Sequence, residues 1–445
     1  MRMWFNSKYV NNGDIFLVNE KNKKYVKDAI KNKASKIVTE LDEEFKIKTE
    51  KTDDIIKYFY DYYYDKIKDL KLIGITGTNG KTTTCYLIYQ MLNLIGIKTA
   101  YIGTIGFYID DMVFKLDNTT PEISLLYNML YYAKKRKCKV VVMEVSSHAL
   151  KQDRIYGLLF DSVLVTNITR DHLDYHKTLK DYIKSKQKLI YQTRGKKICI
   201  LNKKDKYYKK FKIKDNNNLI IGKNVKITLV LMNSSNTYVV VKDKVKRCFI
   251  LPFMGLFNVY NFLYAYYAIK YLGYNLNPLK DKYYLLKEPP GRMEKVKYKS
   301  NNIFIDYAHT PDAVLNVLKT VSKVKNNGII TIIGCGGDRD KEKRPIMAKA
   351  ACKYSSLVIF TNDNPRWEDE KEIMKDILKG ASKNYEVIYD RYDAIRKGVR
   401  MLKDNMILMI LGKGHEDYQI IKGEKLYFSD KDAAYKVIKE LEETN

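Results

Sequence analysis

Paired cysteines and long apolar runs are both missing from this chain, and each absence excludes a class of protein. The six cysteines are scattered and none forms a C-x-x-C pair, which argues against a zinc site or a disulfide framework and for a reducing compartment. The chain contains no run of about 18 apolar residues, which is the length needed to cross a bilayer. Its first residues have no apolar stretch of the length that a signal peptide needs. We therefore expect a cytoplasmic protein without a membrane partner.

The charge is strongly unbalanced, because 81 lysines and arginines face 52 acidic residues and give a formal net charge of +29. Such a value is typical of nucleic-acid-binding proteins, and an ATP-dependent protein of that class is kept as an alternative. The lysines are spread along the whole chain rather than gathered on one element, so we expect no nucleic-acid partner. A basic field would still attract anionic substrates.

The clearest local pattern is a glycine-rich turn between an apolar strand and a helix. Residues 72–75 predict the strand, Gly77-Thr78-Asn79-Gly80 the turn, and residues 86–95 the helix. Backbone N–H groups at such a turn bind phosphates, and small residues let the backbone approach them. Lys81 would neutralise the outer phosphates, and the Thr82 hydroxyl would ligate Mg²⁺. The alternative is a tight strand-to-helix turn with a capping threonine, since the first glycine of the strict motif is not in its place.

Strand and helix signals alternate over residues 71–290 and again over 291–445, after a boundary at Pro289-Pro290-Gly291-Arg292. This alternation predicts a mainly parallel α/β sheet in each stretch. A small unit, residues 1–70, precedes them, so we expect three domains, as a length of 445 residues also suggests. We expect residues 203–250 to form a peripheral insertion of short strands.

Polar clusters follow the predicted strands, where ligands bind in parallel sheets. Glu144 ends one strand and His172 follows the next, so the two could hold Mg²⁺ beside Thr82. The alternative for Glu144 is that it caps the next helix. From local spacing alone, Lys186 is interpreted as a solvent-exposed charge. All five histidines lie in or just beyond strand-end loops, which favours a common functional face: His148, His172, His176, His309 and His415.

With these residues assembled, the chain closely resembles the Mur ligases, the ATP-dependent amide ligases that build the peptidoglycan stem peptide. The nearest type is the meso-diaminopimelate-adding UDP-N-acetylmuramoyl-tripeptide synthetases (MurE), and the resemblance runs from about Ser7 to Asp430. It rests on GTNGKTTT (77–84), NTTPE (118–122), MEVSSHAL (143–150), TNITRDHLDYH (166–176), GLFNVYN (255–261), GRMEKV (291–296), DYAHTPD (306–312), GCGGDRDKEKRP (334–345), DNPR (363–366) and GKGHEDYQ (412–419). The GTNGKT loop is the family's own variant of the phosphate-binding motif.

The resemblance implies one role for each predicted domain. Residues 1–70 would be a UDP-binding domain, shortened in the loop after Val18, residues 71–290 a P-loop ATPase-like domain, and residues 291–445 a Rossmann-like domain that delivers the amino acid. Asn6-Ser7-Lys8 stands where the family has Asp-Ser-Arg, which implies that Ser7 contacts the uridine diphosphate.

The site residues are carried over at matching positions. ATP would be bound by Gly77, Thr78, Asn79, Gly80, Lys81, Thr82, Thr83, Asn258, Asn261, Arg292 and Asp306. The muramoyl-dipeptide would be bound by Ser7, Asn118, Thr119, Thr120, Ser147, Gln152 and Arg154. The diamino acid would be bound by Arg339, Asp363, Asn364, Arg366, Gly412 and Glu416. Two Mg²⁺ ions would be held by Thr82, Glu144, His172 and Lys186, the last as a carbamate (N6-carboxylysine). The catalytic set would be Lys81, Glu144, His172 and Lys186.

The amino-acid pocket indicates the substrate. The resemblance implies that Arg366 pairs with the distal carboxylate of meso-diaminopimelate, while Gly412 and Glu416 receive its distal ammonium. Relatives that add L-lysine lack this arginine. Meso-lanthionine would present the same distal group, so this substrate stays open beside meso-diaminopimelate, and a ligase that uses L-lysine is kept as a further alternative.

The implied reaction joins the diamino acid to UDP-N-acetylmuramoyl-L-alanyl-D-glutamate through an acyl phosphate at the expense of ATP, in a monomer. The alternative ligase is a folylpolyglutamate synthase, which shares the phosphate loop. The DNPR motif and the N-terminal GDIF segment argue against it.

Overall fold

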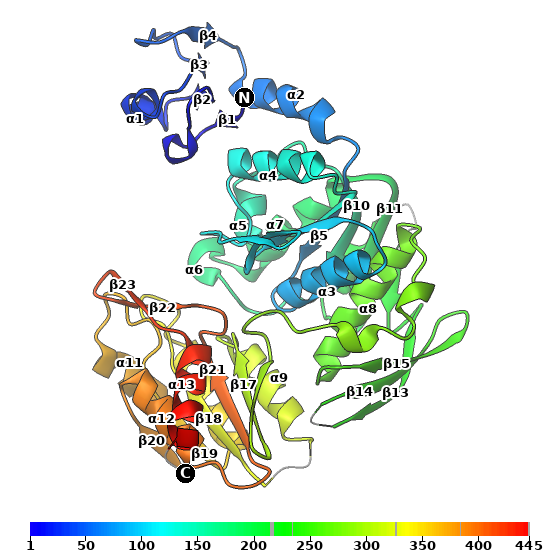
Figure 1. Ribbon diagram of the computed structural model, residues 1–445, viewed down its shortest axis with the longest axis vertical. Coiled ribbons are helices and arrows are strands. Elements are labelled where there is room, and N and C mark those ends of the chain that lie inside the picture. The colour runs from blue at the N-terminus through cyan, green and yellow to red at the C-terminus, as the bar shows by residue number, and fades with distance from the viewer. Residues whose placement is uncertain (214–217, 234, 325–326, 383, 444–445) are drawn as a thin grey trace.

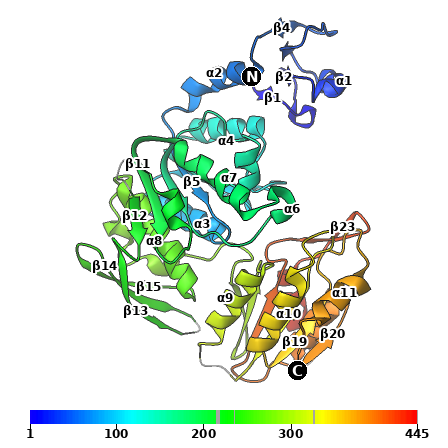
Figure 2. The same cartoon turned by 180° about the vertical axis from the view of Figure 1, so that it is seen from behind.

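The protein is α/β throughout, and its elements form three groups stacked along the long axis (Figure 1). The computed structural model describes residues 1–443 except 214–217, 234, 325–326 and 383. The N-terminal group lies at one end, the C-terminal group at the other, and the central group between them, as the reverse view in Figure 2 also shows. The predicted fold class is confirmed, while the exact boundaries at residues 70 and 290 stay a prediction. Within these described residues, no helix combines the length and apolar character needed to span a membrane.

The N-terminal group is a four-stranded parallel sheet in the order β1-β2-β3-β4. Its elements are β1 (Met3–Trp4), the 3₁₀ turn η1 (Ser7–Tyr9), β2 (Ile15–Val18), α1 (Val26–Lys31), β3 (Lys36–Thr39), β4 (Thr49–Lys51) and α2 (Ile55–Ile67). Helix α2 packs on α4 (Ile123–Lys135) of the central group, where the Phe59 and Tyr127 rings lie 5.1 Å apart. The Tyr63 hydroxyl donates to Asn128 Oδ1 at 2.7 Å. This aromatic contact joins the first group to the second.

The central group is built on an eight-stranded sheet in the order β12-β11-β10-β5-β9-β6-β7-β8. Its strands are β5 (Lys71–Thr76), β6 (Thr99–Gly103), β7 (Gly106–Ile109), β8 (Met112–Phe114), β9 (Val140–Glu144), β10 (Phe160–Val165), β11 (Thr193–Asn202) and β12 (Asn218–Ile221). The strands from β12 to β6 are parallel, and only β7 and β8 are antiparallel to their neighbours. Every residue of β9 is buried, as expected for a strand covered on both faces.

Helices cover both faces of this sheet. α3 (Lys81–Leu94) and α8 (Leu256–Tyr271) pack with Val140 and Val142, whereas α4 and α7 (Leu179–Tyr191) pack with Val141 and Met143. The short helices α5 (Ser147–Lys151) and α6 (Leu173–His176) follow β9 and β10. Because β5 lies between β10 and β9, the loops that leave these three strands start side by side. That placement brings the phosphate loop, Glu144 and the segment before His172 to one edge.

The prediction for residues 203–250 was wrong in part. β12 is hydrogen-bonded to β11 and forms the edge of the central sheet, so this part of the segment is not peripheral to the fold. The remainder forms a separate antiparallel sheet of β13 (Lys226–Met232), β14 (Thr237–Lys242) and β15 (Lys246–Leu251). The apolar residues of β12 are few, so its short run could not be assigned to the central sheet by pattern.

The C-terminal group has a six-stranded sheet in the order β16-β17-β21-β18-β19-β20, parallel except for β16. Its strands are β16 (Glu294–Tyr298), β17 (Asn301–Asp306), β18 (Ile329–Ile333), β19 (Leu357–Phe360), β20 (Tyr385–Val387) and β21 (Ile407–Leu411). One face is covered by α9 (Pro311–Val321), α10 (Lys343–Tyr354) and α11 (Glu370–Leu378), the other by α12 (Arg391–Arg400) and α13 (Asp430–Glu443). A hairpin, β22 (Tyr418–Ile421) and β23 (Glu424–Tyr427), extends from the strand-end loops.

Helix α7 begins with a side-chain cap that can be tested. The Thr178 hydroxyl oxygen accepts a hydrogen bond from the Asp181 backbone N–H at 3.1 Å. Loss of such a cap costs about 1 kcal/mol, so Thr178→Ala is expected to lower the free energy of unfolding in urea by that amount. Thr178→Ser keeps the oxygen and should stay close to the natural protein. Equal stability of the alanine variant would show that the cap contributes nothing.

Candidate active site

The glycine turn at the end of β5 has the geometry of a phosphate-binding loop. Helix α3 starts at Lys81, and Gly80 precedes it with a φ of 85°. An added Cβ at Gly80 would lie 2.5 Å from Asn261 Oδ1, so only glycine fits there. The segment after β10 braces the turn, because the backbone N–H groups of Thr78 and Asn79 donate to the carbonyl and side-chain oxygens of Asn167 at 2.7 and 3.0 Å.

Lys81 is folded back onto this turn. Its ammonium donates to the carbonyl oxygens of Gly77 and Thr78 at 2.9 and 2.8 Å. Burial lowers the pKa of Lys81, and the negative charges of Glu144 and Asp171 oppose that shift. The ammonium is therefore held within reach of any phosphate that settles on the turn.

Glu144 is a buried carboxylate surrounded by donors. Its Oε2 accepts from the hydroxyls of Thr82 and Thr104 at 3.0 and 3.1 Å, and its Oε1 accepts from the Tyr101 hydroxyl at 2.6 Å. The residue that caps helix α5 is Ser146, so the alternative role of Glu144 as a helix cap is wrong. A carboxylate and a hydroxyl side by side are hard oxygen donors of the kind that Mg²⁺ prefers.

Lys186 is not a surface charge, and the interpretation from local spacing was wrong. It lies on the inner side of α7 with 1% of its surface exposed, and its Nζ donates to the Gly77 carbonyl at 2.9 Å. Burial, together with the positive charge of Lys81, lowers the pKa of Lys186 well below its usual value. Spacing could not detect this, because α7 turns this lysine toward the phosphate loop while its neighbour Lys184 stays exposed.

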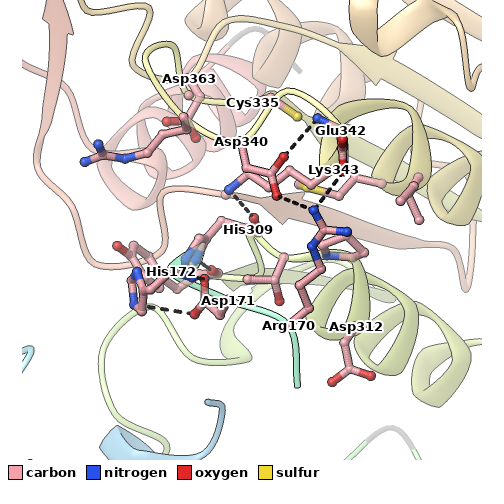
Figure 3. A pocket seen from close by; sticks show the side chains of 18 of the residues that line it. Arg170, Asp171, His172, His309, Asp312, Cys335, Asp340, Glu342, Lys343 and Asp363 are labelled. Atoms are coloured by element: carbon pink, nitrogen blue, oxygen red, sulfur yellow. Dashed lines mark hydrogen bonds and ion pairs between the residues drawn. The ribbon is translucent and has the colours of Figure 1, made fainter. Parts of the chain in front are cut away.

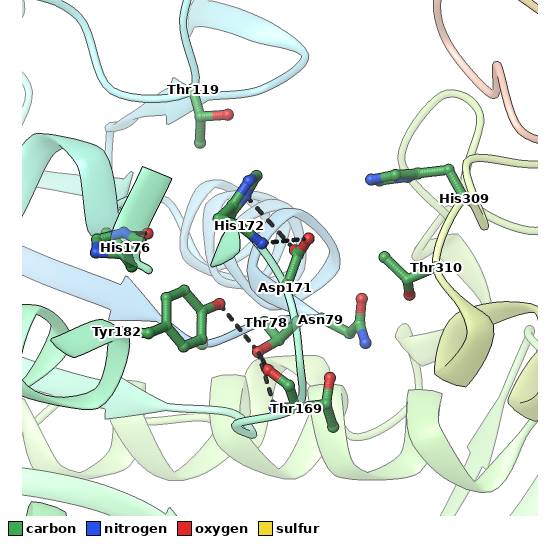
Figure 4. A network of polar contacts seen from close by, with 12 residues as sticks. Thr78, Asn79, Thr119, Thr169, Asp171, His172, His176, Tyr182, His309 and Thr310 are labelled. Atoms are coloured by element: carbon green, nitrogen blue, oxygen red, sulfur yellow. Dashed lines mark hydrogen bonds and ion pairs between the residues drawn. The ribbon is translucent and has the colours of Figure 1, made fainter. Parts of the chain in front are cut away.

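His172 forms the other side of the site. It has a φ of 53°, and its Nε2 lies 3.5 Å from Asp171 Oδ2 (Figure 4). Burial lowers the pKa of His172 to about 4, although the Asp171 carboxylate acts in the opposite direction. The His148 ring lies 4.9 Å from the His172 ring. Asp171 was missed as a site residue; its position directly before His172 was the only signal.

The structure groups the histidines around two neighbouring clusters. The His148 ring contacts the rings of His172 and His176, while His309 and His415 both pack on the ring of Tyr307, at 4.5 and 5.1 Å. Among the described residues, no group of three or more histidine, cysteine or acidic side chains is placed to hold a metal ion. The predicted metal ligands contain only two such side chains, so that set stays a prediction.

One pocket of about 490 Å³ is lined by both larger groups (Figure 3). The central group contributes His148 and residues 169–173. The C-terminal group contributes the strand-end loops after β17, β18, β19 and β21. All six residues predicted for the diamino acid line it: Arg339, Asp363, Asn364, Arg366, Gly412 and Glu416. The loop that carries His172 therefore faces the predicted amino-acid site across a single pocket.

The acidic end of this pocket is a hydrogen-bonded cluster. Asn364 donates to Glu416 Oε2 at 2.9 Å, and Tyr307 donates to Glu416 Oε1 at 3.3 Å. Burial and the neighbouring Asp363 raise the pKa of Glu416. The buried Lys413 donates to Asn364 Oδ1 at 3.3 Å; sequence reasoning missed this lysine, although it lies inside the GKGHEDYQ motif.

Arg366 is held by backbone oxygens beside the acidic cluster. Its Nη1 donates to the Gly337 carbonyl at 2.8 Å, and its φ is 59°. An added Cβ at Gly336 would lie 2.8 Å from that nitrogen, and one at Gly412 would lie 2.6 Å from Asp363 Oδ2. These glycines leave room for the charged side chains. Arg339 lines the same pocket but is exposed.

Polar contacts between described residues join the central and C-terminal groups across the site. Arg170 Nη2 lies 2.7 Å from Glu342 Oε2 (Figure 3). Asn79 Nδ2 donates to Asp312 Oδ2 at 3.3 Å, and Arg292 Nη2 donates to Thr82 Oγ1 at 3.4 Å. Arg292 therefore reaches the phosphate loop from the C-terminal side, and its contact with the nucleotide stays a prediction.

The remaining predicted ATP residues are buried around the loop. Asn261 donates to Asn258 Oδ1 at 3.2 Å and accepts from Thr84 at 3.3 Å. The two oxygens of Asp306 accept from the backbone N–H groups of Met293 and Ala308 at 2.7 and 2.8 Å. It thus organises the loop, and its ribose contact stays a prediction.

The predicted acceptor residues form a connected strip beside Glu144. Arg154 donates to the Thr120 carbonyl at 2.7 Å and to Gln152 Oε1 at 2.9 Å. The hydroxyls of Thr119 and Thr104 lie 3.0 Å apart. Ser147 Oγ lies 2.9 Å from His176 Nε2. Asn118 is exposed, and Ser7 is buried in η1 of the N-terminal group, outside the lining of the pocket.

Comparison with known proteins assigns the chain to a family. The models of the Mur ligase middle domain and of the Mur ligase, glutamate ligase domain match residues 75–269 and 291–414. The UDP-N-acetylmuramoyl-L-alanyl-D-glutamate--2,6-diaminopimelate ligase of Clostridium botulinum is 37% identical, over 98% of this chain and 95% of that protein. The enzyme of the same name from Aquifex aeolicus is 41% identical, over 84% of this chain and 78% of that protein.

Solved structures agree with this assignment. A structure of a UDP-N-acetylmuramoyl-L-alanyl-D-glutamate--2,6-diaminopimelate ligase is 29% identical, with a TM-score of 0.68 over 99% of this chain and 95% of that one. A MurF ligase from Thermotoga maritima in complex with ADP shares the fold at 15% identity, with a TM-score of 0.72 over 100% of this chain and 98% of that one. The resemblance predicted from the motifs is confirmed, and this chain belongs to the Mur ligase family.

Proposed function

We propose that the chain is an ATP-dependent ligase that joins meso-diaminopimelate to UDP-N-acetylmuramoyl-L-alanyl-D-glutamate and releases ADP and phosphate. The observation that carries this proposal is the shared pocket, in which the His172 loop beside the phosphate turn faces all six residues predicted for the diamino acid. The relatives named above support it, because their names describe that reaction.

In the first step the D-glutamate γ-carboxylate attacks the γ-phosphorus of ATP, and the bond to the β-phosphate oxygen breaks. The phosphates would rest on the turn, and Lys81 would exchange the carbonyls of Gly77 and Thr78 for phosphate oxygens. Thr82, Glu144, His172 and the carbamate of Lys186 would hold two Mg²⁺ ions, which neutralise the charge on the transferred phosphoryl group when bound.

A carbamate at Lys186 agrees with the surroundings of that side chain. Addition of CO₂ requires a neutral amine, and burial beside Lys81 favours the neutral form. The product would be an anion close to Lys81 and the phosphate loop, where a negative charge is stabilised. The same surroundings would disfavour an unmodified lysine cation.

In the second step the C-terminal group presents the amine of the diamino acid to the acyl phosphate. Arg366 would pair with the distal carboxylate, and Glu416 with the distal ammonium. Thr120, Gln152 and Arg154 would position the acceptor, since a hydroxyl, an amide and a guanidinium suit an anionic substrate. Much of the rate would come from this positioning.

Substrate assays separate this proposal from its alternatives. Phosphate release from ATP is expected only when the UDP-dipeptide and a diamino diacid are both present, with the amide product identified by mass. A panel of meso-diaminopimelate, meso-lanthionine, L-lysine and L-ornithine assigns the amino acid. Activity with a folate acceptor would instead support a folylpolyglutamate synthase. ATP turnover stimulated by DNA or RNA, without amide product, would overturn the ligase proposal.

We also propose that the protein is a cytoplasmic monomer of three domains.

A further inference from the structure

Amide formation in this pocket needs a base. A diamino acid enters as an ammonium ion, and an ammonium nitrogen has no electron pair with which to attack a carbonyl carbon. One proton must therefore leave before the C–N bond forms. A side chain with a proton-free nitrogen or oxygen, facing the pocket from the side that holds the amino acid, would be placed to accept it.

His309 occupies such a position. It lies between β17 and α9 in the C-terminal group and lines the same pocket as Arg366 and Glu416. Figure 4 shows its ring directed across the gap toward Asp171 and His172. The His309 side chain therefore lies between the side of the pocket that carries the phosphate loop and the side predicted to bind the amino acid.

The hydrogen bonds of His309 determine which nitrogen is basic. Its Nδ1 lies 2.7 Å from the carbonyl oxygen of Tyr307. A carbonyl can only accept, so Nδ1 carries the hydrogen and Nε2 of the neutral ring carries the lone pair. The Tyr307 ring packs against the imidazole at 4.5 Å, and Lys343 Nζ donates to the His309 carbonyl at 3.1 Å. Ring and backbone are both held in place.

The charge state of His309 agrees with a proton-accepting role. Burial and the positive charge of Lys343 lower the pKa of His309 to about 4, while Asp171 acts in the opposite direction. The imidazole is consequently neutral around neutral pH. An acyl phosphate bound nearby would add negative charge and so favour the imidazolium that forms during the reaction.

The other histidines of the pocket are less suited. His148, His172 and His309 line it. His172 faces Asp171 and is proposed to ligate Mg²⁺, and the His148 ring is packed against Tyr175 at 4.2 Å. His309 is the one of the three that belongs to the C-terminal group, which also supplies the residues predicted to hold the amino acid.

We propose that His309 is a catalytic residue that accepts the proton of the attacking amine through Nε2, an inference that rests on the proposed ligase function. The ammonium gives one proton to Nε2 and becomes the free amine. The amine attacks the acyl carbon, the C–N bond forms, and the C–O bond to phosphate breaks. The phosphate leaves with that electron pair and takes the second proton from nitrogen as hydrogen phosphate.

Two nucleophiles test this assignment on one variant. His309→Asn keeps an N–H that can reach the Tyr307 carbonyl but lacks Nε2. With ATP and the UDP-dipeptide, the acyl phosphate is trapped either by meso-diaminopimelate, which must lose a proton first, or by hydroxylamine, which is already neutral in mildly alkaline buffer. We expect amide formation to fall about 100-fold, at the low end of general-base effects. Hydroxamate formation should stay close to that of the natural protein, which also shows that the variant folds and carries out the first step.

Each other outcome contradicts a stated part of the inference. Unchanged amide formation by the variant would remove His309 from the proton transfer. An equal loss of amide and hydroxamate would assign His309 to phosphoryl transfer or to folding instead. Failure of the natural protein to form amide or hydroxamate would contradict the ligase proposal itself rather than the role of His309.

Discussion

Replacement of Lys186 by alanine is expected to lower kcat by about 10³-fold, since it removes the anion proposed to hold Mg²⁺ at the transferred phosphoryl group. The side chain is buried and bonded to the Gly77 carbonyl, so the variant contains a cavity lined by polar atoms. Short-chain carboxylic acids can enter such a cavity and supply the missing carboxylate. We therefore expect them to restore part of the phosphate release, in proportion to their concentration.

Lys184 provides the matched control for this experiment. It lies on the same helix but is exposed, and Lys184→Ala should keep full activity with no response to carboxylic acids. A carbamate NMR signal after incubation with isotopically labelled bicarbonate should be present in the natural protein and absent from Lys186→Ala. If Lys186→Ala has the same kcat as the natural protein, the carbamate proposal is wrong. If the variant loses activity and carboxylic acids restore none of it, Lys186 has a structural role instead.

Much of the site could be predicted because strand-end loops meet at one edge of a parallel sheet. Glu144 ends β9 and the GTNGKT loop follows the neighbouring β5, and the paired register of Ile75 with Glu144 places them together. The residues predicted to bind the amino acid likewise follow β18, β19 and β21, which are adjacent in the second sheet. Short apolar strands with polar ends are visible in the sequence, so both edges could be located.

The rest depends on packing that local sequence does not encode. Lys186 and Lys184 are alike as residues, and only the orientation of α7 decides which of them is buried. The bond of His309 to the Tyr307 carbonyl, which selects the basic nitrogen, is equally invisible in the motif. The two backbone N–H groups that donate to Asp306 could not be predicted from its motif either. Such hydrogen-bond partners can be identified only once the folded conformation of the loops is known.

Arg366→Lys is expected to reduce kcat/KM for meso-diaminopimelate by about 10²–10³-fold, the effect of removing a charge-assisted pair of hydrogen bonds from a half-buried site. The bond that fixes this guanidinium uses Nη1 and the Gly337 carbonyl, so the remaining N–H groups can form a fork on the distal carboxylate. An ammonium cannot form that fork. Arg396→Lys, on the exposed face of α12 beside Asp393, is the control and should leave the rate unchanged.

The stronger test is the ratio between two amino acids. In the natural protein L-lysine leaves Arg366 without a carboxylate partner, and a site built around such a partner rejects a substrate that lacks it by about 10³-fold or more. In Arg366→Lys this penalty shrinks, so the preference for meso-diaminopimelate over L-lysine should fall together with kcat/KM. Equal use of both amino acids by the natural protein would contradict the proposed role. A variant that loses overall rate but keeps the full preference would show that Arg366 maintains the fold of the 334–339 loop instead of reading the distal group.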